Sequence, residues 1–228
     1  FISGKSKSIE FATTDTEGSE PEGPIKFREA KNPGYIARTT ETGLEGDLTI
    51  DFAKTRKGSG ATRRMAGTKW NHIPIDSDGL PITTSKEYKD SITNIAASLA
   101  SGETVNIAGH GIYSIKANQK SVDAAMNSMF SKITQRLKKL GVLNSLPDSA
   151  KIITGGQTGF DEAGAKAAAK YGFKTEVIAP KGYIYRTQPG TRGDIADKAK
   201  FKERFGRSEP TKGKLGRKPK EPTIHEDP

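Results

Sequence analysis

The sequence predicts an α/β protein, a three-layer Rossmann-like parallel sheet with helices on both faces and a small N-terminal β extension. Three observations lead to this fold class. Short apolar segments alternate with amphipathic or alanine-rich segments between residues 84 and 205. Glycines close three of these helical segments, which implies short connections. One apolar segment also passes through a glycine-rich turn directly into a helix, as strands of parallel sheets do.

The two ends of the chain are predicted to be flexible tails. Residues 1–30 and 206–228 are rich in Gly, Ser, Pro, Thr and charged residues, so they have little apolar surface to bury. Much of the basic excess that gives the 228-residue chain a formal net charge of +10 lies near the C-terminal tail. The alternative to a solvated end is a basic tail that contacts nucleic acid or an acidic partner.

Residues 31–83 are predicted to form the β-rich extension. Tyr35–Arg38 has the character of a short strand, and Gly46–Ala53 alternates apolar and polar residues as a half-buried strand does. A basic glycine-rich segment follows, interpreted as a solvated loop with phosphate contact as the alternative. The segment WNHIPI predicts a further strand, ending at Pro74. These strands are too few to fold alone, so we expect the extension to cover the ligand site.

Residues 84–205 are predicted to form the Rossmann-like domain. Thr84 and Glu87 have the spacing of a capping box in front of an apolar helical stripe. The predicted elements are a helix after Thr84, a strand at 104–108, a helix over about 122–140, a strand at 151–154, a helix at 161–171, a strand at 175–179 and a helix from Asp194, as its cap, to 204.

The glycine-rich turn at residues 155–159 is the most informative segment. Its three glycines lie between the end of a strand and the start of a helix. Free amides and the dipole at a helix N-terminus attract anions, and glycines let the backbone approach a phosphate. Gln157 and Thr158 are expected to add side-chain hydrogen bonds. The spacing matches neither the dinucleotide fingerprint nor the P-loop, and the alternative is a turn whose glycines serve packing alone.

Two acidic residues begin the helix that follows this turn. Asp161 and Glu162 are candidates for stabilising positive charge on a ribose or for activating water. The alternative is that both carboxylates complement the helix dipole.

Two further loops are expected at the same edge, because ligands bind beyond the carboxyl ends of parallel strands. His110 could bind phosphate or act as an acid–base group, Tyr113 could stack on a base, and Lys181 could contact a phosphate. A solvent-facing or core position is the alternative for each. The predicted ligand-binding residues are Gly109, His110, Gly111, Tyr113, Gly155, Gly156, Gln157, Thr158, Gly159, Lys181 and Gly182, and the candidate catalytic residues are Glu162 and Asp161.

Residues 155–182, GGQTGFDEAGAKAAAKYGFKTEVIAPKG, resemble the SLOG superfamily. Within it they are most similar to the molybdenum carrier family, whose hallmark is G-G-Q-T-G-x-D, an alanine-rich helix and P-K-G after the next strand. The similarity extends loosely over residues 84–205. It implies a Rossmann-like fold and a ligand that is a nucleotide, a nucleoside phosphate or an NAD-derived molecule.

The same segment is more distantly similar to the Lonely Guy phosphoribohydrolases and to DNA-processing protein A. Against the Lonely Guy pattern G-G-x-G-T-x-x-E, Gly155 and Gly156 match and Glu162 falls on the catalytic glutamate. Thr158 and Gly159 stand in inverted order, and no arginine is assigned as the partner of that glutamate. The resemblance therefore implies binding first, with N-glycosidic bond hydrolysis as the alternative activity.

Composition narrows the function classes further. The absence of cysteine excludes disulfides, iron–sulfur clusters and Cys-type zinc sites, and three scattered histidines favour no metal site. No cofactor is predicted. No signal peptide or membrane-spanning segment is apparent, so we expect a cytoplasmic protein, or a virion protein if it is phage-encoded. The expected partners are a nucleotide-like molecule, nucleic acid through the basic tail and a further copy of the chain. The alternative functions are nucleic-acid binding and carriage of a molybdenum-type cofactor.

Overall fold

Six parallel strands form the centre of the structure, in the order β1-β6-β5-β4-β2-β3. The computed structural model describes residues 24–55 and 60–206, so most of both predicted tails lies outside the described residues. The predicted α/β class is confirmed. The strands are β1 Ile25–Glu29, β2 Leu48–Ala53, β3 Trp70–Pro74, β4 Thr104–Gly109, β5 Lys151–Thr154 and β6 Thr175–Ala179.

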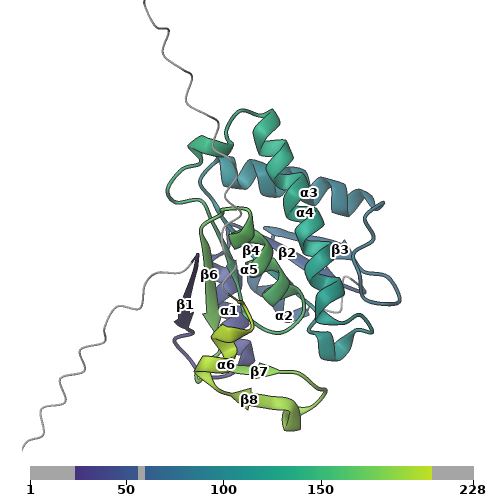
Figure 1. Ribbon diagram of the computed structural model, residues 1–228, viewed down its shortest axis with the longest axis vertical. Helices are drawn as coiled ribbons and strands as arrows, with labels where there is room; N and C mark the ends of the chain where they lie inside the picture. The colour runs from purple at the N-terminus through teal and green to yellow at the C-terminus, as the bar shows by residue number, and fades with distance from the viewer. Residues whose placement is uncertain (1–23, 56–59, 207–228) are drawn as a thin grey trace, which may run out of the picture.

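Helices cover both faces of this sheet (Figure 1). In that view α3, α4 and α5 lie in front of the sheet, and α1 and α2 lie behind it. The front layer encloses the larger apolar core, which includes Phe52, Phe130 and Phe160. The helices are α1 Tyr35–Glu45, α2 Gly60–Ala66, α3 Lys86–Ala100, α4 Gln119–Lys139, α5 Phe160–Lys170 and α6 Lys198–Glu203, with 3₁₀ turns at Ile112–Ser114, Leu143–Ser145 and Thr191–Gly193.

The strands before residue 84 extend the main sheet at both of its edges. β1 pairs with β6 from Ile25 to Glu29, within the predicted N-terminal tail, and β3 pairs with β2 at the opposite edge. Joining an existing sheet gives these strands the backbone partners that a separate two-strand layer would lack. The described residues place the small antiparallel pair near the C-terminal end instead, as β7 Ile184–Arg186 and β8 Asp194–Ala196.

Three predictions for the N-terminal region are wrong. The strand expected to be half-buried is β2, and all of Leu48–Ala53 is buried because helices cover both faces of the sheet. Tyr35–Arg38 begins helix α1, not a strand, because Arg38, Thr42 and Gly43 recur at helical spacing on the face toward the protein. Four residues are too few to reveal that period from the sequence. The basic glycine-rich loop also contains a helix, α2, of which Ala66 is buried. Residues 56–59 of that loop lie outside the described part of the chain.

The elements predicted after residue 84 are confirmed except for two caps and the start of the last helix, and two short strands, β7 and β8, were not predicted. Ser85, not Thr84, caps α3, because its side chain accepts a hydrogen bond from the Tyr88 amide. Asp194 starts β8 instead of capping the last helix, whose cap is Asp197. Each observed cap accepts a free amide of the first helical turn, Ser85 from Tyr88 and Asp197 from Lys200.

Strand order fixes where a ligand site is expected. The chain passes from β2 outward to β3, returns across β2 to β4, and then continues away from β2 through β5 and β6. The carboxyl ends of β2 and β4 therefore form the topological switch point, where the connections leave in opposite directions. Within residues 24–55 and 60–206, no helix combines the length and apolar character needed to cross a bilayer.

Candidate functional site

The candidate site lies at the carboxyl edge of the sheet, next to the switch point. The loops after β4, β5 and β6 reach this edge, as does the N-terminal end of α1. These segments bring together a set of aromatic and charged side chains, which we call the edge cluster. Its members are Tyr35, Arg38, Tyr113, Asp161, Arg186 and Asp194.

The glycine-rich turn is packed tightly beneath this cluster. Gly155, Gly156 and Gly159 are buried, and the last two have positive φ angles of 71° and 91°. A Cβ atom at position 156 would lie 2.5 Å from the Phe201 ring, and one at 159 would lie 2.3 Å from the His110 carbonyl oxygen. The glycines therefore serve close packing and backbone conformation at this turn.

The amides of this turn are largely bonded inside the protein. The Gly159 amide donates to Gln119 Oε1 at 2.6 Å, and the Phe160 amide donates to the His110 carbonyl at 3.4 Å. The Gly156 amide donates to Thr154 Oγ1 at 3.3 Å. Gln119, which sequence reasoning did not single out, thus occupies a position where a phosphate was expected at the start of α5.

Gln157 and Thr158 hold the segment that follows β6. Gln157 donates to the Ile184 carbonyl and accepts from the Arg186 amide, both at 3.1 Å. Thr158 donates to the Arg186 carbonyl at 2.7 Å. These two side chains therefore fix strand β7, and with it the side chain of Arg186, over the turn.

Asp161 is ion-paired beneath the turn. Its carboxylate is 2% exposed and accepts from Arg38 Nη1 at 2.9 Å. Burial raises the pKa of Asp161, and Arg38 offsets part of that rise. Gly155 leaves the space for this pair, since a Cβ atom there would lie 1.6 Å from Arg38 Nη1.

Glu162 is also ion-paired. Its carboxylate, 3% exposed, accepts from Arg204 Nη1 at 2.8 Å and from Lys166. Arg204 also donates to the Gly156 carbonyl at 2.7 Å, and its guanidinium lies 4.1 Å from the centre of the Tyr185 ring. Burial raises the pKa of Glu162, and these two cations oppose the rise. Both candidate catalytic carboxylates are therefore structural ion pairs in this conformation.

Arg186 lies close to two aromatic rings at the surface of the site. Its guanidinium carbon is 5.0 Å from the centre of the Tyr35 ring and 5.7 Å from that of Tyr113. Asp194 accepts from Arg186 Nε at 2.6 Å and from the Tyr35 hydroxyl at 2.9 Å. Burial and the bond to Asp194 raise the pKa of Tyr35 to about 12.

His110 and its flanking glycines follow β4 at the switch point. Gly109 lies against Phe52 and Phe160, and Gly111 lies under the Tyr113 ring, so side chains at either position would collide. His110 Nδ1 is 3.1 Å from Ser114 Oγ, and its buried Nε2 has no hydrogen-bond partner among residues 24–55 and 60–206. This nitrogen is the one polar side-chain atom of the turn at 109–111 that a ligand would satisfy.

The charge of His110 gives a direct test of this environment. Burial, and then the nearby charge of Lys54, lowers the pKa of His110 below its ordinary value of 6.5. We expect its ring to titrate by NMR with a midpoint below 6.5 and to be neutral at pH 7. Because the folded pKa is depressed, stability from this group is lost as pH falls through that midpoint. A midpoint above 6.5 would contradict the buried position of the ring.

The remaining predicted residues, Lys181 and Gly182, follow β6 at the carboxyl ends of the strands, on the side of β1. The Gly182 amide donates to the Glu29 carboxylate, and Lys181 is exposed. In the described part of the chain no hydrogen bond or ion pair joins either residue to the edge cluster, so the loop after β6 contributes Arg186 rather than Lys181. In the described ranges no group of three or more metal-ligating side chains is present.

The fold and this edge define a Rossmann-like α/β protein with an arginine- and tyrosine-rich site beyond the strand ends. Comparison with known proteins finds no relative of this chain. No protein-family model matches the chain, and neither a curated protein nor a solved structure is similar to it at the threshold applied.

Proposed function

We propose that the protein binds a nucleotide-like anion, a nucleotide, nucleoside phosphate or NAD-derived molecule, at the edge cluster. The observation that carries this proposal is the position of Arg186, close to two tyrosine rings, of which Tyr113 follows β4 at the switch point. Guanidinium groups bind phosphates in bidentate geometry, and tyrosine rings stack on bases. The same few residues thus supply both chemistries that a nucleotide requires.

Each residue has a distinct part in the proposed binding. Gln157 and Thr158 hold the backbone of Arg186, and Asp194 holds its guanidinium, so its orientation is set before a ligand arrives. Its partner Asp194 is one quarter exposed, which leaves this ion pair open to exchange for a phosphate. Tyr113 and the unpartnered Nε2 of His110 lie on the adjacent loop and supply stacking and one hydrogen bond.

The ion pairs of Asp161 and Glu162 favour binding over hydrolysis. A general base must reach the substrate or a water beside it, and both carboxylates are nearly fully buried and paired with arginines. We therefore propose a binding protein, with Arg38 and Arg204 supporting the turn. If N-glycosidic hydrolysis nonetheless occurs, Glu162→Gln should abolish turnover and leave ligand affinity within about twofold.

Calorimetric titration with AMP, ADP-ribose and NAD tests the proposal. We expect at least one of these to bind, and Arg186→Gln to weaken that binding about tenfold or more, the effect of losing a charge-assisted phosphate contact. Arg192→Gln is the matched control, because Arg192 is an exposed arginine in the same region without a contact to the edge cluster. Affinity unchanged in Arg186→Gln would place the ligand elsewhere.

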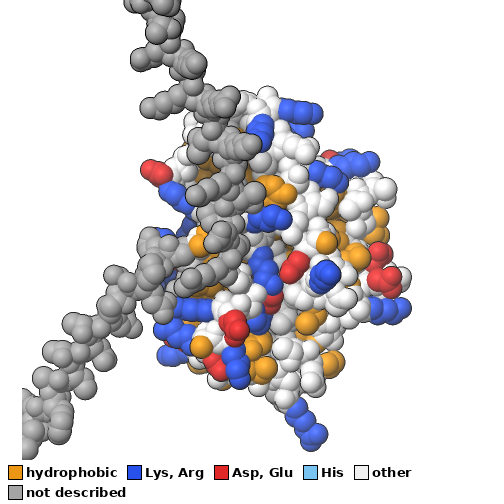
Figure 2. All heavy atoms as spheres, viewed as in Figure 1, with side chains coloured by type: hydrophobic (Ala, Val, Ile, Leu, Met, Phe, Trp, Pro, Cys, Tyr) orange, Lys and Arg blue, Asp and Glu red, His pale blue; other side chains and the backbone are white. Residues whose placement is uncertain are grey.

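Short DNA and RNA duplexes belong in the same titration. Figure 2 shows Lys and Arg side chains spread over the visible face, with acidic and apolar side chains between them. Such a surface favours a small anion over a duplex, which needs a continuous basic stripe. Tight, strongly salt-dependent binding of a duplex together with no binding of nucleotides would reject the proposal.

A further inference from the structure

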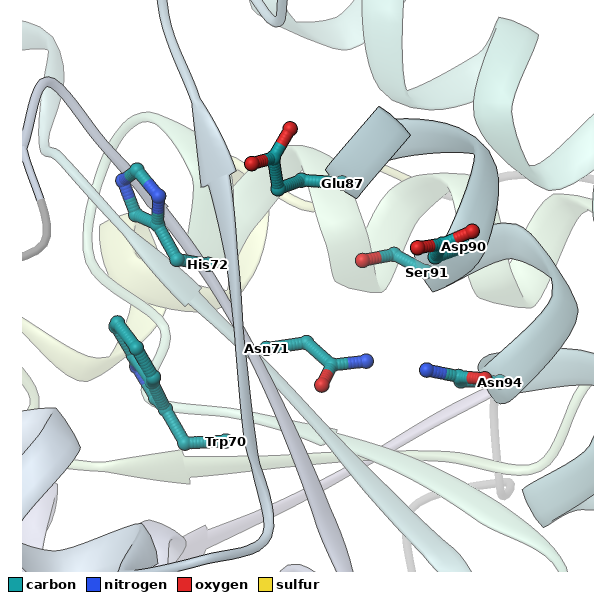
Figure 3. Close-up of a pocket in the computed structure, with 7 residues that line it drawn as sticks. All are labelled: Trp70, Asn71, His72, Glu87, Asp90, Ser91 and Asn94. Atoms are coloured by element: carbon teal, nitrogen blue, oxygen red, sulfur yellow. The ribbon is translucent and has the colours of Figure 1, made fainter. Parts of the chain in front are cut away.

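A second site lies beside β3, the outermost strand on one side of the sheet, between β3 and α3 (Figure 3). It is a cavity of about 170 Å³, the size of one long side chain and too small for a nucleotide. Residues of β3 line one side of it, and residues from the first half of α3 line the other. In Figure 3 the Asn71 side chain points toward α3, and the side chains of Trp70 and His72 point to the other face of β3. This site contributes nothing to the proposed nucleotide binding and stands independently of it.

The backbone of β3 is open along this cavity. β3 is the last strand of the sheet, and β2 covers only its inner side. The Thr49 amide donates to the Lys69 carbonyl at 2.7 Å, which sets the alternation of the ladder. Successive residues of a strand point their amides and carbonyls to opposite sides, so those of Trp70 and His72 point away from β2. In the described part of the chain no strand pairs with them.

Polar side chains converge on the cavity. Ser91 is only 1% exposed, and its buried hydroxyl has no hydrogen-bond partner within the described residues. In Figure 3 this hydroxyl points from α3 toward β3, and the amides of Asn71 and Asn94 approach each other below it. A buried hydroxyl left unpaired costs free energy unless a bound group satisfies it. The cavity is therefore built for a polar occupant.

The charge of the cavity is negative, although the whole chain is basic. Glu87 and Asp90 both line it, and no counter-ion pairs with the Glu87 carboxylate within the described residues. Asp90 pairs with Lys86 on the exposed side of the helix. The acceptors in the cavity are thus carboxylate, hydroxyl and amide oxygens, a set that suits a guanidinium group with its five donors.

The side chains of Trp70 and His72, on the other face of β3, are fixed by their own contacts. The Trp70 indole donates to Asp51 Oδ2 at 3.3 Å, and His72 Nε2 lies 2.8 Å from the Ala53 carbonyl. The Arg63 guanidinium lies 5.3 Å from the centre of the Trp70 ring. These contacts hold β3 in position without an occupant, which lowers the cost of binding.

We propose that an extended polypeptide segment adds to the open edge of β3 and places an arginine side chain in this cavity. Backbone hydrogen bonds to Trp70 and His72 would supply affinity, and the cavity would supply selection for a basic side chain. The partner is therefore a protein with an exposed, extended, arginine-containing segment. A second copy of this chain, paired edge to edge, is the competing occupant that the test must exclude.

The test is an NMR titration with a capped pentapeptide of alternating Thr and Val and a central arginine. We expect saturable shifts at Trp70, His72 and the Asn94 side-chain amide, with a dissociation constant of about 1 mM or tighter. Glu87→Gln should weaken binding about tenfold, and Ser91→Ala should weaken it severalfold. Glu203→Gln, an exposed carboxylate on α6, is the matched control and should leave the affinity unchanged.

A second peptide keeps the proposal falsifiable if a variant does not fold. Citrulline in place of arginine preserves the shape and removes the charge, and it should bind the unaltered protein at least about tenfold more weakly. Equal affinity for the two peptides would overturn the proposal, as would shifts confined to other surfaces or none at all. A dimer in light scattering that dissociates on substitution of Trp70 would assign the edge to a second copy instead.

Discussion

Gly155→Ala is expected to destabilise the protein by about 3–5 kcal/mol, the cost of leaving a buried charge without its partner. The added Cβ atom would lie 1.6 Å from Arg38 Nη1 and 2.3 Å from its Cζ, so the guanidinium must leave its present position. Asp161, buried beneath it, would then lose its cation. Urea unfolding followed by circular dichroism measures the change in the free energy of unfolding.

Gly172→Ala is the matched control for this substitution. Gly172 has a φ angle of 82°, but no atom lies within 4 Å of the Cβ position. We expect a loss of about 1–2 kcal/mol there, from backbone conformation alone. If Gly155→Ala costs no more than Gly172→Ala, the contact between the turn and Arg38 is not the reason for glycine at position 155.

Arg38→Met is expected to cost about 3–5 kcal/mol at pH 7, for the same reason. Asp161 then stays buried with only backbone donors, such as the Gln157 amide. Adding Asp161→Asn should recover much of the loss, because a neutral amide needs no counter-ion. A double variant no more stable than Arg38→Met would contradict a direct coupling between the two residues.

The pH dependence of Arg38→Met provides a second measurement of the same pair. Burial already raises the pKa of Asp161 in the intact protein, and loss of Arg38 should raise it further. A carboxyl whose pKa is higher in the folded than in the unfolded state makes the folded protein less stable as pH rises. The loss begins near the unfolded pKa, about 3.9, and continues until pH passes the folded pKa. The stability gap between the intact protein and the variant should therefore widen from pH 4 to pH 7. A gap independent of pH would contradict this account.

The sequence was sufficient to predict most of the sheet. Strands β4, β5 and β6 are short apolar segments between helices with a clear 3.6-residue period, and glycines such as Gly102 and Gly172 mark where those helices end. Local signals of this kind hold because each of these strands is buried in an apolar cluster. The N-terminal helix α1 lacked such a signal, because its buried residues include polar Arg38 and Thr42.

The sequence predicted which loops meet at the carboxyl edge of the sheet, but not the contacts that they make there. The turn at 155–159 and the loop at 109–113 do meet at the carboxyl edge, as parallel strands require. The amides of the turn, however, are bonded to Gln119 and to the His110 carbonyl. Nothing in the spacing of the glycines distinguishes an amide that faces a phosphate from one that faces a glutamine 40 positions away.

The arginines of the site could not be predicted from local pattern either. Arg38 and Asp161 are 123 positions apart, and Arg204 and Glu162 are 42 apart. A carboxylate at a buried helix start does require a cation, which is the physical signal that was available. Which arginine supplies it depends on the packing of α1 and α6 against the turn.

The central claim is that a nucleotide-like anion binds at the edge cluster, and amide NMR with ADP-ribose tests it most directly. We predict saturable shifts at residues 109–114 and 184–186, with Arg186 and Tyr113 among the largest. These shifts should weaken together in Arg186→Gln and persist in Arg192→Gln. Saturable shifts that avoid both segments, or an unchanged spectrum with ADP-ribose, AMP and NAD alike, would contradict the account.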